Sequence, residues 1–114
     1  MLSLIRADFT IKSVPCFING AYSPITSTHF DDYHNIIILL NGSKTFYLAP
    51  QGSIINTPNK NENETDANPH DKVSTFVKTT LTSGDMLFIP EGWWHYVESR
   101  PNSIMLNFWF VRRT

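Results

Sequence analysis

The chain has 114 residues, a net charge of −1 and one cysteine. This length suits a single domain with one core, and the near-neutral charge offers no broad basic field for binding nucleic acid. A lone cysteine excludes an internal disulfide, and we expect Cys16 to be reduced and buried. With no apolar run of about 18 residues and no signal-peptide pattern, we expect no membrane span and an intracellular protein, cytoplasmic or nuclear.

Short apolar runs between turn signals predict an all-β chain, since the apolar spacing of an amphipathic helix is nearly missing. We expect the first strand at Val14–Asn19. The β-branched run Asn35–Leu40 is expected to be buried on both faces, and the Asn41-Gly42 turn to lead into Lys44–Leu48 as its hairpin partner. Further strands are expected at Thr75–Leu81, Met86–Ile89, Trp93–Glu98 and Ser103–Val111. Seven or eight strands at this spacing favour a sandwich or barrel.

The composition changes abruptly between Gln51 and Ser74. Residues 56–69 contain no large apolar side chain, so burial cannot offset the entropy lost on ordering them. We therefore expect residues 52–74 to form a mobile loop insert, and we assign it no chemistry. The whole of residues 1–114 is treated as one domain, with truncation at both ends left open.

Two imidazoles and one carboxylate stand out as a metal-ligand set. His29 and Asp31 are two residues apart, so in an extended segment both side chains leave the same face, about 6.6 Å apart at Cα. His95 follows 64 residues after Asp31, in a strand-like segment. Such a set suits non-haem Fe(II), because it leaves coordination positions open for substrate and dioxygen. The alternative for His29 is a hydrogen-bonded strand histidine, since matches to His-x-acid often arise by chance.

Several further segments accompany these residues in a regular order. They are Tyr33-His34-Asn35, the runs Asn41–Pro50 and Leu81–His95, and Asn107–Phe110. Together with Thr26-x-x-His29-x-Asp31, their order, spacing and residue types resemble the JmjC and cupin-like family of Fe(II)- and 2-oxoglutarate-dependent oxygenases. The resemblance covers about residues 14–111 and is strongest to the protein-hydroxylase branch of that family.

The resemblance implies a double-stranded β-helix, the cupin-like jelly roll, with a metal at its more open end. In that family the residues matching His29, Asp31 and His95 bind the iron. The implied function is that of a dioxygenase that hydroxylates a protein side chain and releases succinate and CO2. Its cofactors are Fe(II), 2-oxoglutarate and O2, and its partner is a protein or peptide substrate. The sequence sets no oligomeric state.

The resemblance also assigns residues to the cosubstrate. Lys44, fifteen residues after the first metal ligand, matches the lysine that pairs with the distal carboxylate of 2-oxoglutarate. Thr26 resembles the hydroxyl that shares this carboxylate. Asn35 and Asn107 match positions near the metal-chelating end of the cosubstrate, and Trp109 resembles the aromatic wall of the pocket.

Elementary chemistry is compatible with these roles but leaves alternatives open. A lysine charge neutralises a carboxylate, although a solvated surface lysine is the ordinary reading of Lys44. Asn35 and Asn107 interrupt apolar strands, and buried amides need partners from backbone, water or a ligand. His34 and His70 match no family position and are expected to be exposed or structural.

Other functions compete with the hydroxylase. One is a catalytically silent binding module or fragment with the same fold. Another is a lysine demethylase. A third is a cupin that uses the same ligands for zinc or manganese in isomerase or hydrolytic chemistry, which predicts no need for Lys44 paired with Thr26.

Overall fold

The computed structural model describes residues 9–20, 23–53, 63–65, 67–71 and 75–112, which form ten strands and no helix. Within this described part, no helix has the length and apolarity to cross a membrane. The strands are β1 (Phe9–Ser13), β2 (Cys16–Ile18), β3 (Thr28–His29), β4 (His34–Asn41), β5 (Ser43–Ala49), β6 (Glu64–Thr65), β7 (Val77–Thr82), β8 (Met86–Ile89), β9 (Trp94–Ser99) and β10 (Ile104–Arg112).

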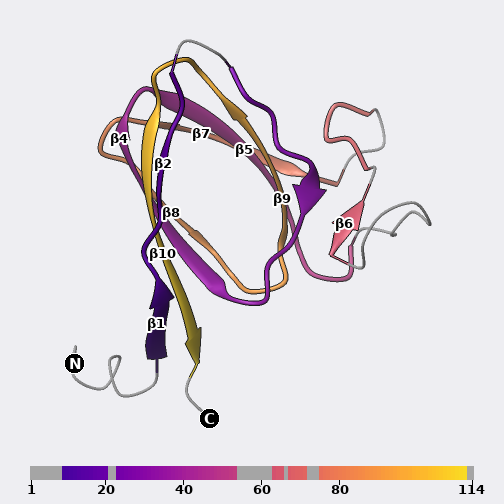
Figure 1. Ribbon diagram of the computed structural model, residues 1–114. Coiled ribbons are helices and arrows are strands. Elements are labelled where there is room, and N and C mark those ends of the chain that lie inside the picture. The colour runs from indigo at the N-terminus through magenta and orange to yellow at the C-terminus, as the bar shows by residue number, and fades with distance from the viewer. Residues whose placement is uncertain (1–8, 21–22, 54–62, 66, 72–74, 113–114) are drawn as a thin grey trace.

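The strands form two antiparallel sheets that face each other (Figure 1). Sheet A has the order β1-β10-β4-β8, with β2 also paired to β10. Sheet B has the order β6-β3-β9-β5-β7. The chain passes from one sheet to the other between β3 and β4, between β4 and β5, and at each connection from β7 to β10. This alternation makes a double-stranded β-helix and confirms the predicted all-β, cupin-like jelly roll.

The predicted hairpin between the fourth and fifth strands is wrong. β4 pairs with β8 and β10 in sheet A, whereas β5 pairs with β7 and β9 in sheet B. Gly42 does form a tight turn, with a left-handed φ of 89°. A Cβ atom there would lie 2.4 Å from Ser103 Oγ, so the turn packs against the β9–β10 connection. Turn residues specify a reversal of the chain, but they do not specify the sheet that the next strand joins.

The N-terminal prediction also needs correction. The expected strand at Val14–Asn19 is limited to Cys16–Ile18, and it is preceded by β1, which sequence reasoning missed. Both strands pair with β10, and Pro15 separates them because proline lacks the N–H that continues a ladder. Cys16 is a free thiol, but the expectation that it is buried is wrong, since all three residues of β2 are exposed.

The expectation that Asn35–Leu40 is buried on both faces is wrong as well. Along β4, buried residues alternate with half-buried ones, and Leu40 is 51% exposed. The inner face carries Asn35, Ile37 and Leu39, so the strand has the period-two pattern of a sheet with one covered face.

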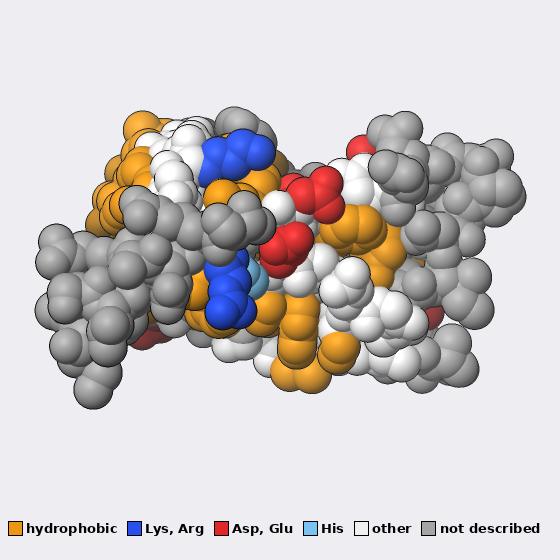
Figure 2. All heavy atoms as spheres, turned by 90° about the horizontal axis from the view of Figure 1, so that it is seen from below, with side chains coloured by type: hydrophobic (Ala, Val, Ile, Leu, Met, Phe, Trp, Pro, Cys, Tyr) orange, Lys and Arg blue, Asp and Glu red, His pale blue; other side chains and the backbone are white. Residues whose placement is uncertain are grey.

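Much of the outer face of sheet A is apolar and exposed. Phe88 and Met86 on β8 are 51% and 63% exposed, and Ile11 on β1 is 63% exposed. Sheet A lies at the left of the molecule in Figure 1. Figure 2 shows hydrophobic side chains gathered on that same left side.

The core fills the space between the two sheets. Its buried side chains are Ile37, Leu39, Phe46, Leu48, Leu81, Ile89, Val97 and Met105. The same inner faces also carry polar residues, since Asn35 precedes Ile37 by one inward position and Lys44 precedes Phe46 in the same way. The interior therefore changes from apolar core to polar cavity along individual strands.

The predicted loop insert lies partly outside the described residues, which omit 54–62, 66 and 72–74. Its described remainder contains a strand that sequence reasoning missed. β6 pairs with β3, with Thr65 opposite Thr28 and Glu64 opposite His29. Thr28 Oγ1 also donates a hydrogen bond to the carbonyl of Ala67, at 2.7 Å. These bonds attach the described part of the insert to sheet B beside His29.

Candidate metal centre and adjoining cavity

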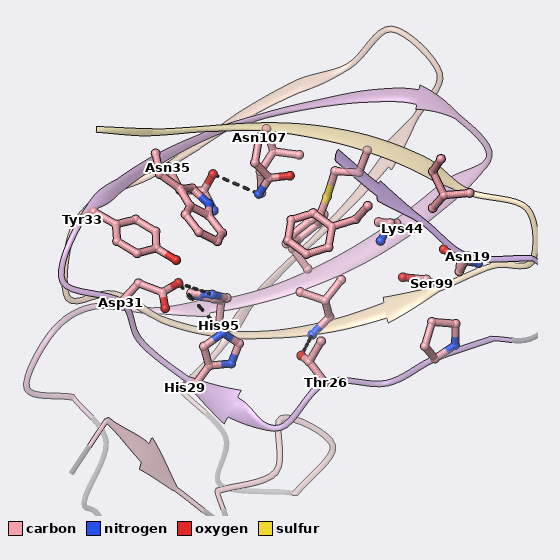
Figure 3. Close-up of a pocket in the computed structure, with 18 residues that line it drawn as sticks. Asn19, Thr26, His29, Asp31, Tyr33, Asn35, Lys44, His95, Ser99 and Asn107 are labelled. Carbon is pink, nitrogen blue, oxygen red and sulfur yellow. Dashed lines mark hydrogen bonds and ion pairs between the residues drawn. The ribbon is translucent and has the colours of Figure 1, made fainter. Parts of the chain in front are cut away.

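Strand pairing brings the three predicted metal ligands together. His29 ends β3 and lies directly opposite His95 of β9, while Asp31 follows two residues later. Asp31 Oδ2 is 3.3 Å from Nε2 of His95 and 4.0 Å from Nε2 of His29. The three residues can each offer one donor atom, all within 4.8 Å of one another (Figure 3). This spacing fits a single ion bound by two imidazoles and a carboxylate.

Backbone carbonyls fix the orientation of both imidazoles. His29 Nδ1 lies 2.8 Å from the carbonyl of Ser27, and His95 Nδ1 lies 3.1 Å from the carbonyl of Trp93. A carbonyl only accepts, so each Nδ1 carries the proton and donates it. In the neutral ring, Nε2 is then left with its lone pair directed at the shared position, as is usual for metal-binding histidines.

The electrostatics of His29 and Asp31 favour the forms of these two side chains that bind a metal. Burial lowers the pKa of His29, and the neighbouring His95 lowers it further. Burial acts to raise the pKa of Asp31, but the hydrogen bond and charge of His95 outweigh it, so the pKa is lower than usual. Near neutral pH this gives a neutral His29 imidazole beside an ionised carboxylate, and metal ions bind these deprotonated forms.

A cavity of about 430 Å³ extends from these donors into the interior, and Lys44 lines it. Lys44 is 6% exposed, and burial lowers the pKa of its ammonium group. No carboxylate of the described residues forms an ion pair with it. Because a buried charge is costly without a partner, this cavity is suited to an anion. The alternative of a solvated surface lysine is therefore wrong.

Thr26 lines the same cavity as Lys44. Its Oγ1 accepts a hydrogen bond from the backbone N–H of Val97, at 3.0 Å, and its own N–H donates to the carbonyl of Val97. These bonds hold the segment before β3 against β9. A hydroxyl that accepts one bond still has a proton to donate, so Thr26 can add a hydrogen bond to an anion in the cavity.

The two predicted amides meet inside the cavity. Asn107 Nδ2 donates to Asn35 Oδ1 at 3.1 Å, so part of their hydrogen-bonding capacity is satisfied by each other (Figure 3). Asn107 Oδ1 and Trp109 Nε1 are buried and have no hydrogen-bond partner among the described residues. A buried acceptor and a buried donor of this kind are normally satisfied by water or a ligand. Trp109 lines the cavity, directly opposite Asn35 across the strand pair.

Sequence reasoning assigned no role to Tyr33, which also lines the cavity. Two signals could have found it, namely its position two residues after Asp31 and its place in the segment Tyr33-His34-Asn35, which belongs to the family resemblance. The two other histidines lie outside the cavity, as expected. His34 Nδ1 accepts the backbone N–H of Glu91 at 3.0 Å, and His70 Nε2 lies 2.9 Å from a carboxylate oxygen of Glu98.

The fold and the ligand set define a cupin, and the chain belongs to the cupin-like domain family, which it matches over residues 9–114. Among curated relatives it is 28% identical over 136 residues to the lysine-specific demethylase JMJ31 of Arabidopsis thaliana, covering 96% of this chain and 24% of that protein. It is 30% identical over 104 residues to the Jumonji C domain-containing protein 5 of Drosophila melanogaster, covering 80% and 26%. The chain thus spans about a quarter of these relatives, and its predicted JmjC and cupin-like resemblance is confirmed.

Solved structures show the same fold. The Escherichia coli ribosomal oxygenase YcfD, solved in complex with cobalt and 2-oxoglutarate, superimposes with a TM-score of 0.64 at 17% identity. The match covers 91% of this chain and 24% of YcfD. A second structure of YcfD contains cobalt and succinic acid, with a TM-score of 0.62 at 17% identity.

Proposed function

We propose that this domain is an Fe(II)- and 2-oxoglutarate-dependent oxygenase that hydroxylates a protein side chain. The observation that carries the proposal is Lys44, a buried ammonium without an anionic partner in the described residues, in the cavity that also holds the three donors. A metal site alone suits many reactions. A metal site joined to a buried cation suits a ligand that chelates the metal at one end and carries a negative charge at the other.

The donor set fits the metal, since His29, Asp31 and His95 present three atoms to one position. These residues would hold Fe(II), which with 2-oxoglutarate and O2 supplies the oxidising power for hydroxylation, with succinate and CO2 as co-products. Lys44 and Thr26 would bind the distal carboxylate of 2-oxoglutarate through one charge and one hydroxyl.

The amide pair and the aromatic wall complete the proposed cosubstrate site. The unpartnered Oδ1 of Asn107 and Nε1 of Trp109 offer an acceptor and a donor inside the cavity. Asn35 is fixed by its bond to Asn107, so its amide nitrogen is directed away from that bond. These groups would orient the bound molecule and exclude bulk water from it.

The competing cupin reading, with zinc or manganese in isomerase or hydrolytic chemistry, is less well supported. It predicted no need for a lysine and a hydroxyl in the same cavity, yet Lys44 and Thr26 both line it. The names of similar proteins support a protein substrate, since they include a lysine-specific demethylase and a ribosomal oxygenase. Demethylation of a lysine side chain is therefore the second candidate.

An anaerobic titration tests the oxygenase proposal. Fe(II) followed by 2-oxoglutarate should produce a visible metal-to-ligand charge-transfer band in the wild-type protein. The band should be lost in His29→Ala and weakened in Lys44→Ala, whereas His70→Ala, which alters an exposed histidine outside the cavity, should leave it unchanged. A folded wild-type protein without the band would refute the proposal.

Product analysis separates the two candidate reactions. In air, candidate peptides are incubated with Fe(II) and 2-oxoglutarate, and succinate is measured beside the peptide mass. A peptide that gains one oxygen atom supports hydroxylation. A peptide that loses a methyl group, with release of formaldehyde, would instead establish demethylation.

A further inference from the structure

Tyr33 lies in the short segment that joins β3 to β4, two residues after the ligand Asp31. Its hydroxyl is directed at the Asp31 carboxylate (Figure 3), and the two side chains are hydrogen-bonded. The phenol supplies the proton of this bond, because an ionised carboxylate can only accept. Tyr33 is therefore a hydrogen-bond donor to the carboxylate.

Aromatic stacking fixes the ring of Tyr33. The ring stacks on Trp109, with centroids 4.6 Å apart and planes 27° apart. Trp109 in turn has Phe17 at a centroid distance of 6.3 Å and lies opposite Asn35 in the pairing of β10 with β4. The phenol is thus held by sheet A, while the histidine ligands belong to sheet B.

The carboxylate of Asp31 needs such a partner. Asp31 lies beyond the end of β3, so strand pairing does not fix it as it fixes His29. A carboxylate rotates about the bond to its Cβ atom, and the angle decides which oxygen faces the metal. Hydrogen bonds from neighbouring residues normally set this angle, and their loss typically weakens metal binding by about 10- to 100-fold.

We propose that Tyr33 is a positioning residue, which orients Asp31 as a metal ligand and links that ligand to the Trp109 wall of the cavity. This inference rests on the proposed metal-dependent function, but it concerns metal binding rather than turnover. It predicts that one hydroxyl group outside the ligand set controls both the strength and the geometry of metal binding.

Cobalt(II) binding to the whole chain tests the inference without any reaction. Tyr33→Phe removes the hydroxyl and keeps the ring that stacks on Trp109. We expect this variant to bind Co(II) about 10-fold more weakly or worse, with shifted visible d–d bands, because the carboxylate is no longer fixed. Tyr96→Phe is the matched control, since it removes a hydroxyl that hydrogen-bonds the carboxylate of Glu98 outside the cavity. It should keep the wild-type affinity and spectrum.

The outcomes separate the two proposals. Wild-type protein that fails to bind Co(II) would overturn the proposed function and the role of Tyr33 together. Wild-type binding with an unchanged Tyr33→Phe affinity and spectrum would overturn the role of Tyr33 alone. Trp109→Phe provides a second test, since it keeps the hydroxyl but reduces the stacking surface. It should shift the d–d bands in the same direction by a smaller amount, and unchanged bands would refute the link to the wall.

Discussion

Replacing Lys44 with methionine separates two effects of its buried charge, one on the stability of the fold and one on the affinity for 2-oxoglutarate. The substitution keeps an unbranched side chain among Phe46, Val97 and the other cavity residues, but removes the ammonium group. Lys44 has no ion partner in the described part of the chain, so folding transfers an uncompensated charge out of bulk water. Replacing buried ionic groups with hydrophobic residues often stabilises a protein by about 1–4 kcal/mol. We expect about 1–2 kcal/mol here, because the open cavity admits water to the ammonium group.

The same substitution should weaken cosubstrate binding. A hydrogen bond to a charged group contributes about 1.5–3 kcal/mol, so its loss corresponds to an affinity for 2-oxoglutarate about 10- to 150-fold lower. The variant is therefore expected to be more stable without ligand and less stabilised by it. This opposite pair of effects is typical of a residue whose charge serves a ligand rather than the fold.

Urea unfolding, with and without 2-oxoglutarate in the presence of Co(II), measures both effects. Lys78→Met is the control, since Lys78 is exposed, with its Nζ 5.9 Å from the centroid of the Tyr47 ring, and does not line the cavity. It should leave the stabilisation by 2-oxoglutarate unchanged and should lower the ligand-free stability by at most about 0.5–1 kcal/mol, because it removes one exposed cation–π contact. If Lys44→Met lowers the ligand-free stability and binds 2-oxoglutarate as tightly as the wild type, the reasoning is wrong.

Three further predictions follow from the same structure. Because burial lowers the pKa of Lys44, its charged fraction falls earlier than usual as the pH rises. Calorimetry at constant Co(II) should therefore show 2-oxoglutarate binding that weakens with rising pH already below 10.5, the ordinary pKa of a lysine, and this dependence should be absent from Lys44→Met. Gly42→Ala should cost about 3 kcal/mol or more, measured by urea unfolding, since a Cβ atom there would lie 2.7 Å from Ser103 Cα. Gly84→Ala, with a similar φ of 93° but open space, should cost only about 1 kcal/mol, and equal losses would exclude the steric argument. Asn107→Leu should lower the free energy of unfolding by about 1–3 kcal/mol in the same assay, because the buried Oδ1 of Asn35 loses the donor Asn107 Nδ2. An unchanged urea midpoint would contradict this.

Polar residues that face the cavity could be predicted from the sequence, because they interrupt runs of apolar residues. Asn107 interrupts an apolar strand, and the structure places it in a polar cavity with a partner amide. Spacing predicted that His29 and Asp31 would leave the same face, and the family resemblance added His95. The donor atoms of all three residues do converge. Their proposed roles in binding iron and cosubstrate stay predictions until a metal titration is made.

What the sequence did not reveal depends on pairing between distant strands. The turn at Gly42 was recognised, but whether β5 returns to β4 or crosses to the other sheet is decided by β9 and β7, far along the chain. Two-residue strands such as β3 and β6 carry no period that could be recognised. Tyr33 was missed for a similar reason, since its contact with Trp109 joins residues 76 positions apart.

The exposed apolar residues on the outer face of sheet A have a practical consequence for work with the isolated domain. Burying apolar surface is favourable by about 25 cal/mol for each Å². In concentrated solution, copies of the domain should therefore tend to associate through this face. Leu40 and Met86 are exposed there and do not line the cavity. Glutamate or lysine at these two positions should make the domain more soluble while leaving the metal donors and Lys44 intact.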